Sequence, residues 1–111
     1  MTANEYQKLA LRTARTDLDS TQQLLNGALG LAGESGEVVD EIKRHLFQGH
    51  WLDRTHVKRE LGDICWYLAI AADAIGCTLD DVFQTNIDKL KARYPDGFEV
   101  ERSINRKEGD T

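Results

Sequence analysis

The stretch GLAGESGEVVDEI, residues 30–42, decides the fold, because it combines a helical apolar spacing with two features that weaken a helix. Glycines occupy positions 30, 33 and 36, and a glycine inside a helix costs about 1 kcal/mol relative to alanine. Carboxylates occupy positions 34, 37, 40 and 41, and like charges this close on one helix repel each other. A neighbouring helix or a ligand beside the glycines, and a divalent cation beside the carboxylates, would offset these penalties.

The composition indicates one soluble domain made mostly of helices. The chain has 111 residues, of which 41% are hydrophobic and 30% charged, and its single proline is Pro95. The net charge of −5 argues against a nucleic-acid polymer as partner, but it allows a small phosphorylated ligand held through a divalent cation.

The compartment is also predicted from composition. No apolar run approaches the ~20 residues that span a membrane, and the start, MTANEYQKLA, lacks the apolar core of a signal peptide. Cys65 and Cys77 show no metal-binding spacing and are expected to be reduced core thiols. We therefore expect a cytoplasmic protein without a membrane partner.

The spacing of apolar residues predicts four helices joined by short loops, at residues 3–15, 20–47, 54–76 and 79–93. Apolar residues three and four apart form one stripe along the second helix, at Leu24, Ala28, Leu31, Val38, Ile42 and Leu46. The turn signal YPDGF ends the fourth helix. These helices predict an all-α antiparallel four-helix bundle over residues 1–98 and a polar, partly disordered tail over 99–111. We expect a homo-oligomer, because such a bundle buries more apolar surface when it dimerises.

Two acidic pairs are predicted to face each other across the second and third helices. Glu34 and Glu37 form E-x-x-E, and Glu60 and Asp63 form E-x-x-D, so each pair shares one helix face. Four converging carboxylates repel strongly without a counter-ion, and Mg²⁺ prefers oxygen ligands of this kind. The alternative is a solvated acidic face. Glycines at 27, 30, 33 and 36 would let a neighbouring helix or a ligand approach the backbone.

The fourth helix carries a polar stripe of Asn86, Lys89 and Arg93, spaced by three and four residues. The stripe would either form salt bridges or hold phosphate oxygens. Tyr67 lies on the acidic stripe of the third helix, four residues after Asp63. It would either cover a substrate ring or phosphate, or serve as a half-buried tyrosine of the bundle.

Three segments together carry a family resemblance: GLAGESGEVVDEIKRHLFQGHWLD, KRELGDICWYLAIAADAIG and NIDKLKARYPDGF, within about residues 28–98. With these motifs the sequence resembles the all-α nucleoside triphosphate pyrophosphohydrolases of MazG type. The resemblance implies a bundle assembled as a dimer or a dimer of dimers. It also implies Mg²⁺-dependent hydrolysis of nucleoside triphosphates, dNTPs or non-standard NTPs among them, to monophosphate and pyrophosphate, with Mn²⁺ as a possible substitute.

The resemblance also implies residue roles. The metal ligands would be Glu34, Glu37, Glu60 and Asp63, and either Glu34 or Glu37 would accept the proton of the attacking water. Lys89 and Arg93 would bind phosphates, and Asn86 would contact metal, phosphate or sugar. Some relatives have a further Glu before E-x-x-E, where this chain has Gly33, so the number of metals stays open.

Other assignments stay open at this point. His45, His50 and Trp51 would either stack on a base or cover the core near the loop between the second and third helices. A di-iron site is disfavoured, because neither Glu34 nor Glu60 has a histidine three residues later. A non-catalytic helical module that binds nucleotides or a protein is the alternative function. The sequence leaves open the base and sugar preference, the choice between dimer and tetramer, and the biological role.

Overall fold

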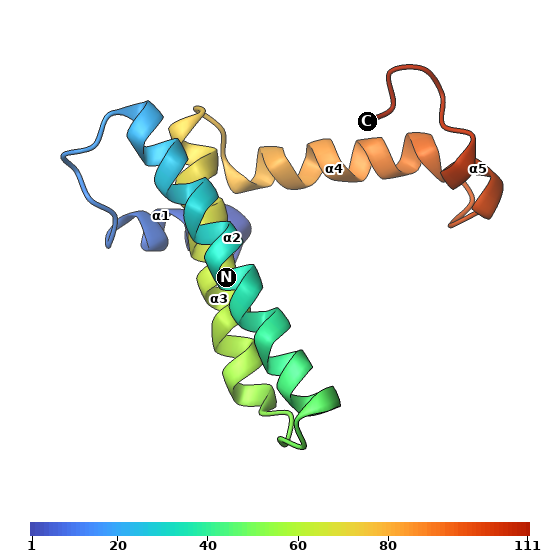
Figure 1. Ribbon diagram of the computed structural model, residues 1–111. Helices are drawn as coiled ribbons and strands as arrows, with labels where there is room; N and C mark the ends of the chain where they lie inside the picture. Colours follow the sequence, from blue (N-terminus) through green and yellow to red (C-terminus); the bar gives the residue numbers. More distant parts are fainter. The chain divides into compact units, whose positions relative to one another are not determined.

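The computed structural model describes residues 1–111 and is all-helical, as predicted. Its five helices are α1 (Ala3–Leu11), α2 (Ser20–Phe47), α3 (Arg54–Ala74), α4 (Leu79–Arg93) and α5 (Val100–Ile104) (Figure 1). The chain divides into two compact units, Met1–Leu79 and Asp80–Thr111. We describe each unit by itself.

The helix boundaries follow from local capping. Asp19 accepts a hydrogen bond of 2.8 Å from the backbone N–H of Gln22, and the Gln22 side chain accepts one from the N–H of Asp19, so both cap the start of α2. Asp53 caps α3 by accepting from the N–H of His56 at 3.0 Å. These bonds satisfy backbone donors that no helical carbonyl reaches.

Two predicted helices are longer than the observed ones, and one helix was not predicted. α1 ends at Leu11 rather than at residue 15, and α3 ends at Ala74 rather than at residue 76. Gly76 has a φ of 77°, which glycine adopts without steric cost, and the chain turns there. Within the polar tail, predicted to be partly disordered, Val100–Ile104 form α5.

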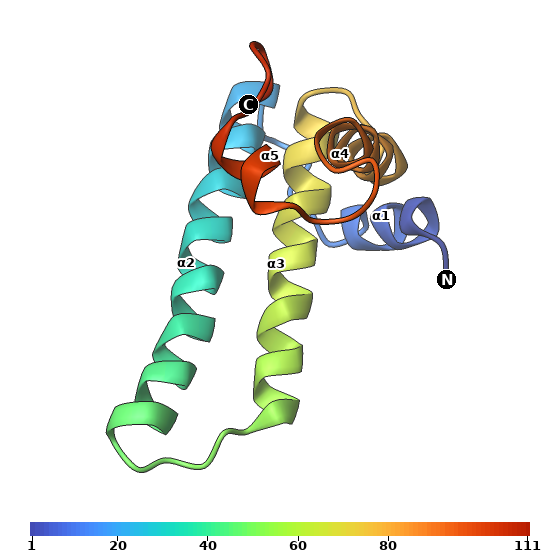
Figure 2. The same cartoon turned by 90° about the vertical axis from the view of Figure 1, so that its right-hand side faces the viewer.

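The first unit is built on an antiparallel pair of long helices, α2 and α3, which run side by side in both views (Figures 1 and 2). Glycines allow the two backbones to come close. A Cβ added at Gly27 would lie 2.9 Å from the Cβ of Ala71, and one added at Gly30 would collide with the ring of Tyr67. This confirms the expected close neighbour at two glycines. At Gly33 and Gly36 nothing lies within 4 Å of an added Cβ.

A small core fixes α1 against α3. Its buried apolar members are Ala10, Ala69, Ala72 and Leu79. The buried Gln7 side chain donates to the carbonyls of Ala69 and Cys77 at 3.3 and 3.2 Å, and it accepts from the N–H of Leu79 at 3.0 Å. The indole N–H of Trp66 also donates to Thr13 at 2.8 Å. Because the buried Gln7 side chain is fully paired in this way, it holds one arrangement of the helices.

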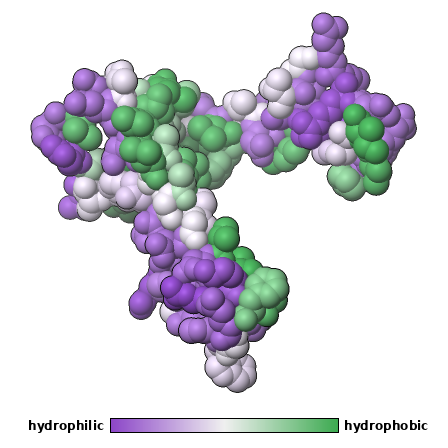
Figure 3. Space-filling model, in the orientation of Figure 1, coloured by the Kyte–Doolittle hydropathy of each residue, from purple (hydrophilic) through white to green (hydrophobic).

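The apolar stripe predicted on α2 is only partly buried by the chain itself. Leu24, Ile42 and Leu46 are 40%, 44% and 63% exposed. Figure 3 shows apolar side chains gathered at the surface of the first unit. Large apolar residues also reach the surface of α2 and α3 at Leu25, Leu29, Val39, Phe47, Leu61 and Leu68. No single helix is long and apolar enough to cross a membrane. By length and composition alone, α3 and α4 could do so only as a bent pair.

Candidate metal centre

Three of the four predicted carboxylates come together between α2 and α3. Oxygen atoms of Glu34, Glu60 and Asp63 all lie within 4.8 Å of one another. Glu60 and Asp63 share a face of α3 because they are three residues apart. Glu34 lies one turn after Gly30, where the ring of Tyr67 packs on the α2 backbone, so this contact sets the distance between the two helices beside the cluster.

The electrostatics of the cluster show an excess of negative charge. The pKa of Glu34 is raised to about 7, mainly by a hydrogen bond with Glu60, and also by desolvation and by the charges of Glu60, Asp63 and Glu37. Two carboxyl groups that share a hydrogen bond must hold a proton between them. A hard divalent cation can replace that proton, and an oxygen-only donor set fits Mg²⁺ or Mn²⁺.

Glu37 is not one of the three converging residues. It lies one turn after Glu34 on α2, its side chain is exposed, and its charge is the last of the contributions that raise the Glu34 pKa. The structure therefore places Glu37 at the edge of the cluster, and its role as ligand or base stays a prediction.

Sequence reasoning missed two residues that extend the cluster. The Nε2 atom of His56 lies 3.2 Å from a carboxylate oxygen of Glu60 and 3.3 Å from one of Glu41. The Glu41 and Glu60 side chains are 18% and 13% exposed. His56 thus joins α2 to α3 and restrains the Glu60 carboxylate. Its spacing of four residues from Glu60 was the available signal, whereas the contact with Glu41 depends on the packing of two helices.

Asp40, the fourth acid of the opening stretch, is balanced locally and lies outside the converging group. Lys43 and Arg44 approach its carboxylate at 2.9 and 2.6 Å. The hydrogen bond from Lys43 and the nearby Arg44 hold the pKa of Asp40 below its ordinary value.

The predicted aromatic residues lie in different environments. The Tyr67 ring packs on Gly30 and meets the Trp66 ring edge to face, with centroids 5.1 Å apart. Trp51 is 94% exposed in the loop between α2 and α3. The ring of His45 lies 2.8 Å from the carbonyl of His50, so these two residues close that loop. A role for Tyr67 or Trp51 in binding a base stays a prediction.

The predicted phosphate-binding residues belong to α4, in the second unit. Asn86 and Lys89 are exposed, whereas Arg93, at the end of α4, is already paired with Asp110 of the tail. The predicted stripe therefore lies along one face of α4, and its last residue, Arg93, is already paired with Asp110.

Fold and cluster together define an all-helical protein with carboxylates gathered between two antiparallel helices. The family model of the MazG nucleotide pyrophosphohydrolase domain matches residues 22–98, and this chain belongs to that family. A similar protein is the Gene 37 protein of Mycobacterium phage L5, which is 34% identical over 85 residues, covering 73% of this chain and 75% of the phage protein. No solved structure matches the chain. α1 and residues 99–111 lie outside the family match.

Proposed function

We propose that the protein is a Mg²⁺-dependent nucleoside triphosphate pyrophosphohydrolase that forms a nucleoside monophosphate and pyrophosphate. Deoxynucleoside triphosphates or non-standard nucleotides are the proposed substrates, and Mn²⁺ is the proposed substitute for Mg²⁺. The observation that carries the proposal is the convergence of Glu34, Glu60 and Asp63, with the pKa of Glu34 raised to about 7, in a member of the MazG family.

Glu34, Glu60 and Asp63, with Glu37 beside them, would hold the metal. The bound ion would neutralise the triphosphate and make a bound water more acidic. Either Glu37 or Glu34 would accept the proton of the water that attacks the α-phosphorus. The bond from that phosphorus to the oxygen bridging toward the β-phosphorus would break, and pyrophosphate would leave with the electron pair.

The other predicted residues would position the substrate. Lys89 and Arg93 would balance charge on the departing pyrophosphate, and Asn86 would contact metal, phosphate or sugar. Tyr67 and Trp51 offer aromatic surfaces to a base.

We also propose that the protein is an antiparallel four-helix bundle that assembles as a homodimer or a dimer of dimers. The support is the apolar surface that α2 and α3 leave exposed, including Leu29 and Leu46, which are 65% and 63% exposed. Burial of apolar surface is the main force in such association. We propose that the protein is located in the cytoplasm, where nucleoside triphosphates are present.

Product analysis tests the reaction. The full chain is incubated with each common NTP and dNTP and with dUTP, in Mg²⁺ and in EDTA, and the products are separated by chromatography. We expect metal-dependent monophosphate and pyrophosphate. Diphosphate and orthophosphate would show cleavage of the other anhydride bond and overturn the proposed reaction. Nucleotide binding without turnover would favour the non-catalytic module instead.

A further inference from the structure

The second unit contains a pocket that the end of α4 shares with the tail. It has a volume of about 380 Å³, within the range of small-molecule sites. Its cationic lining residues are Lys89 and Arg93 of α4, Arg102 of α5, and Arg106 and Lys107 of the tail. Its acidic lining residues are Glu108 and Asp110. The pocket is therefore rich in positive charge within a chain whose net charge is −5.

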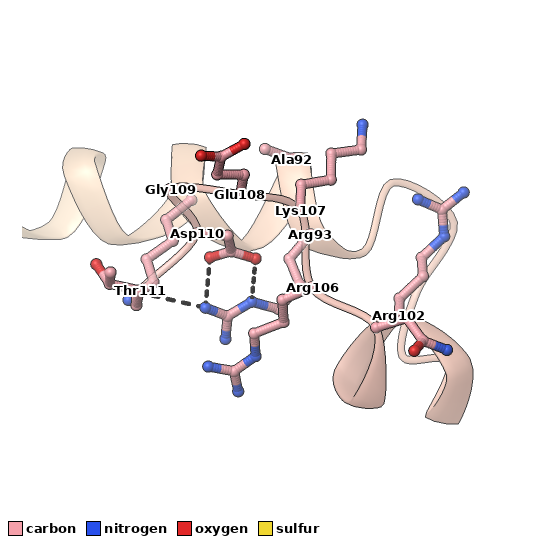
Figure 4. Close-up of a pocket in the computed structure, with 11 residues that line it drawn as sticks. Ala92, Arg93, Arg102, Arg106, Lys107, Glu108, Gly109, Asp110 and Thr111 are labelled. Carbon is pink, nitrogen blue, oxygen red and sulfur yellow. Dashed lines mark hydrogen bonds and ion pairs between the residues drawn. The ribbon is translucent and has the colours of Figure 1, made fainter.

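One carboxylate occupies the centre of this positive charge. Nε and Nη2 of Arg93 donate to the two oxygens of Asp110 at 2.8 and 2.6 Å, and Nη2 also donates to the carbonyl of Thr111 at 3.4 Å (Figure 4). The Arg93 and Asp110 side chains are 10% and 17% exposed. Hydrogen bonding by Arg93 holds the pKa of Asp110 below its ordinary value, with further lowering by Arg106 and Lys89.

The paired geometry is one that an oxyanion of phosphate can adopt equally well. Arginine binds a carboxylate and a phosphate through the same fork of two parallel N–H groups. Asp110 brings a single negative charge to five cations, of which Arg102 lies 3.5 Å from Glu99. A polyphosphate brings several charges to the same fork and can reach further lysine and arginine side chains.

We propose that residues 99–111 complete a binding pocket for a linear polyphosphate, and that Asp110 occupies the Arg93 fork until the polyphosphate displaces it. The ligand is the triphosphate chain of a nucleotide or inorganic pyrophosphate, which share this chemistry. The inference rests on the proposed function for the assignment of Lys89 and Arg93 to phosphate. It adds Arg102, Arg106 and Lys107 as ligands and gives Asp110 the role of an internal competitor.

Calorimetric titration with inorganic pyrophosphate in EDTA tests the competition, because chelation removes any metal bridge to the carboxylate cluster. Asp110→Asn should bind pyrophosphate about tenfold more tightly than the natural chain, since a charge-assisted hydrogen bond no longer competes. Glu101→Gln is the matched control, because it removes one negative charge from the same unit outside the pocket. Equal affinities for Asp110→Asn and Glu101→Gln, or no binding by either, would overturn the proposal.

The tail cations are tested by the double variant Arg106→Gln and Lys107→Gln. Pyrophosphate binding should weaken about tenfold. The control is Lys8→Gln with Arg12→Gln, which removes two positive charges from α1 and the residue after it and should leave the affinity unchanged. An equal loss in both double variants would show an effect of net charge alone and would count against the pocket.

Displacement is observed directly in the natural chain, without dependence on how any variant folds. The Nε–H signal of Arg93 is followed by NMR during titration with pyrophosphate and, separately, with a nucleoside triphosphate in EDTA. The chemical shift of this signal should follow a binding curve with the same dissociation constant as calorimetry gives. Comparison of the two titrations shows which polyphosphate binds. A signal that stays fixed at saturation would overturn the displacement of Asp110.

Turnover is measured separately with Mg²⁺, so the two proposals can fail independently. Tighter pyrophosphate binding by Asp110→Asn without hydrolysis of any nucleotide would keep the pocket and reject the reaction. Hydrolysis with unchanged pyrophosphate binding in Asp110→Asn would keep the reaction and reject the pocket.

Discussion

Carboxylates in the two units of this protein have opposite electrostatic environments. In the first unit, the hydrogen bond with Glu60 and the surrounding acids raise the pKa of Glu34 to about 7. In the second, the guanidinium of Arg93 lowers the pKa of Asp110. We propose that the first group receives a divalent cation, whereas Asp110 is already paired with Arg93 and is proposed to be displaced by a polyphosphate. Neighbours, rather than the residue type, decide which of these roles a carboxylate takes.

The largest expected effect comes from neutralising the acidic cluster. Asp63→Asn should lower turnover at least ~100-fold, because a proposed metal ligand is lost while the side chain keeps its shape. Glu37→Gln should also abolish turnover if this exposed carboxylate serves as ligand or base. Metal-dependent hydrolysis is the measurement, with circular dichroism to show that the helices remain. Asp73→Asn on α3 is the control, and near-normal turnover in Asp63→Asn would contradict the metal assignment.

The packing that creates the cluster is tested at two glycines of the same helix. Gly30→Ala should lower the free energy of unfolding by about 1–3 kcal/mol, because the new methyl group collides with the Tyr67 ring. Gly33→Ala should raise it by up to about 1 kcal/mol, since nothing lies within 4 Å and alanine favours the helix. Denaturant unfolding of both variants gives the comparison. Equal changes would mean that the α2–α3 contact does not fix the helices.

His56 contacts both Glu60 and Glu41 beside the cluster, so its removal tests how firmly the Glu60 carboxylate is held. His56→Ala should weaken Mn²⁺ binding about tenfold, because the Glu60 carboxylate loses a contact that restrains it. Titration followed by electron paramagnetic resonance measures free Mn²⁺ directly. His50→Ala in the loop is the control. Unchanged affinity in His56→Ala would show that Glu60 is held by other contacts.

The smallest expected effect is an opposite dependence of stability on pH in the two units. Glu34 has a raised pKa, so its favourable contribution is complete below its ordinary value of 4.5 and disappears as pH rises through about 7. Asp110 has a lowered pKa, so its contribution is present above its ordinary value of 3.8 and disappears as pH falls through the lowered value.

Thermal unfolding in EDTA across these ranges measures the dependence. Glu34→Gln should remove the decline that accompanies rising pH, and Asp110→Asn should remove only the part at low pH. Excess Mg²⁺ should restore stability at high pH, because an ion that binds the folded cluster stabilises it. A decline that persists unchanged in Glu34→Gln would assign it to other groups.

The sequence by itself determined four of the five helices and the candidate ligands, because these depend on local periodicity. The bounds of α2 and α4 match the prediction, and the caps and turn signals explain why. The pairs Glu34–Glu37 and Glu60–Asp63 follow from the three-residue spacing on one helix face. The family resemblance, now confirmed, depends on the order of these same motifs.

Only the tertiary structure decided which side chains meet. The two acidic pairs were predicted to face each other, but which three carboxylates converge, and the contact of His56 with Glu41, depend on the offset and rotation of two helices. The contacts at Gly27 and Gly30 set that geometry.

The pairing of Arg93 with Asp110 likewise required a tail that folds back over the end of α4, which no periodicity encodes. Spacing within a helix is fixed by covalent geometry and hydrogen bonding, whereas contacts between segments depend on how side chains pack.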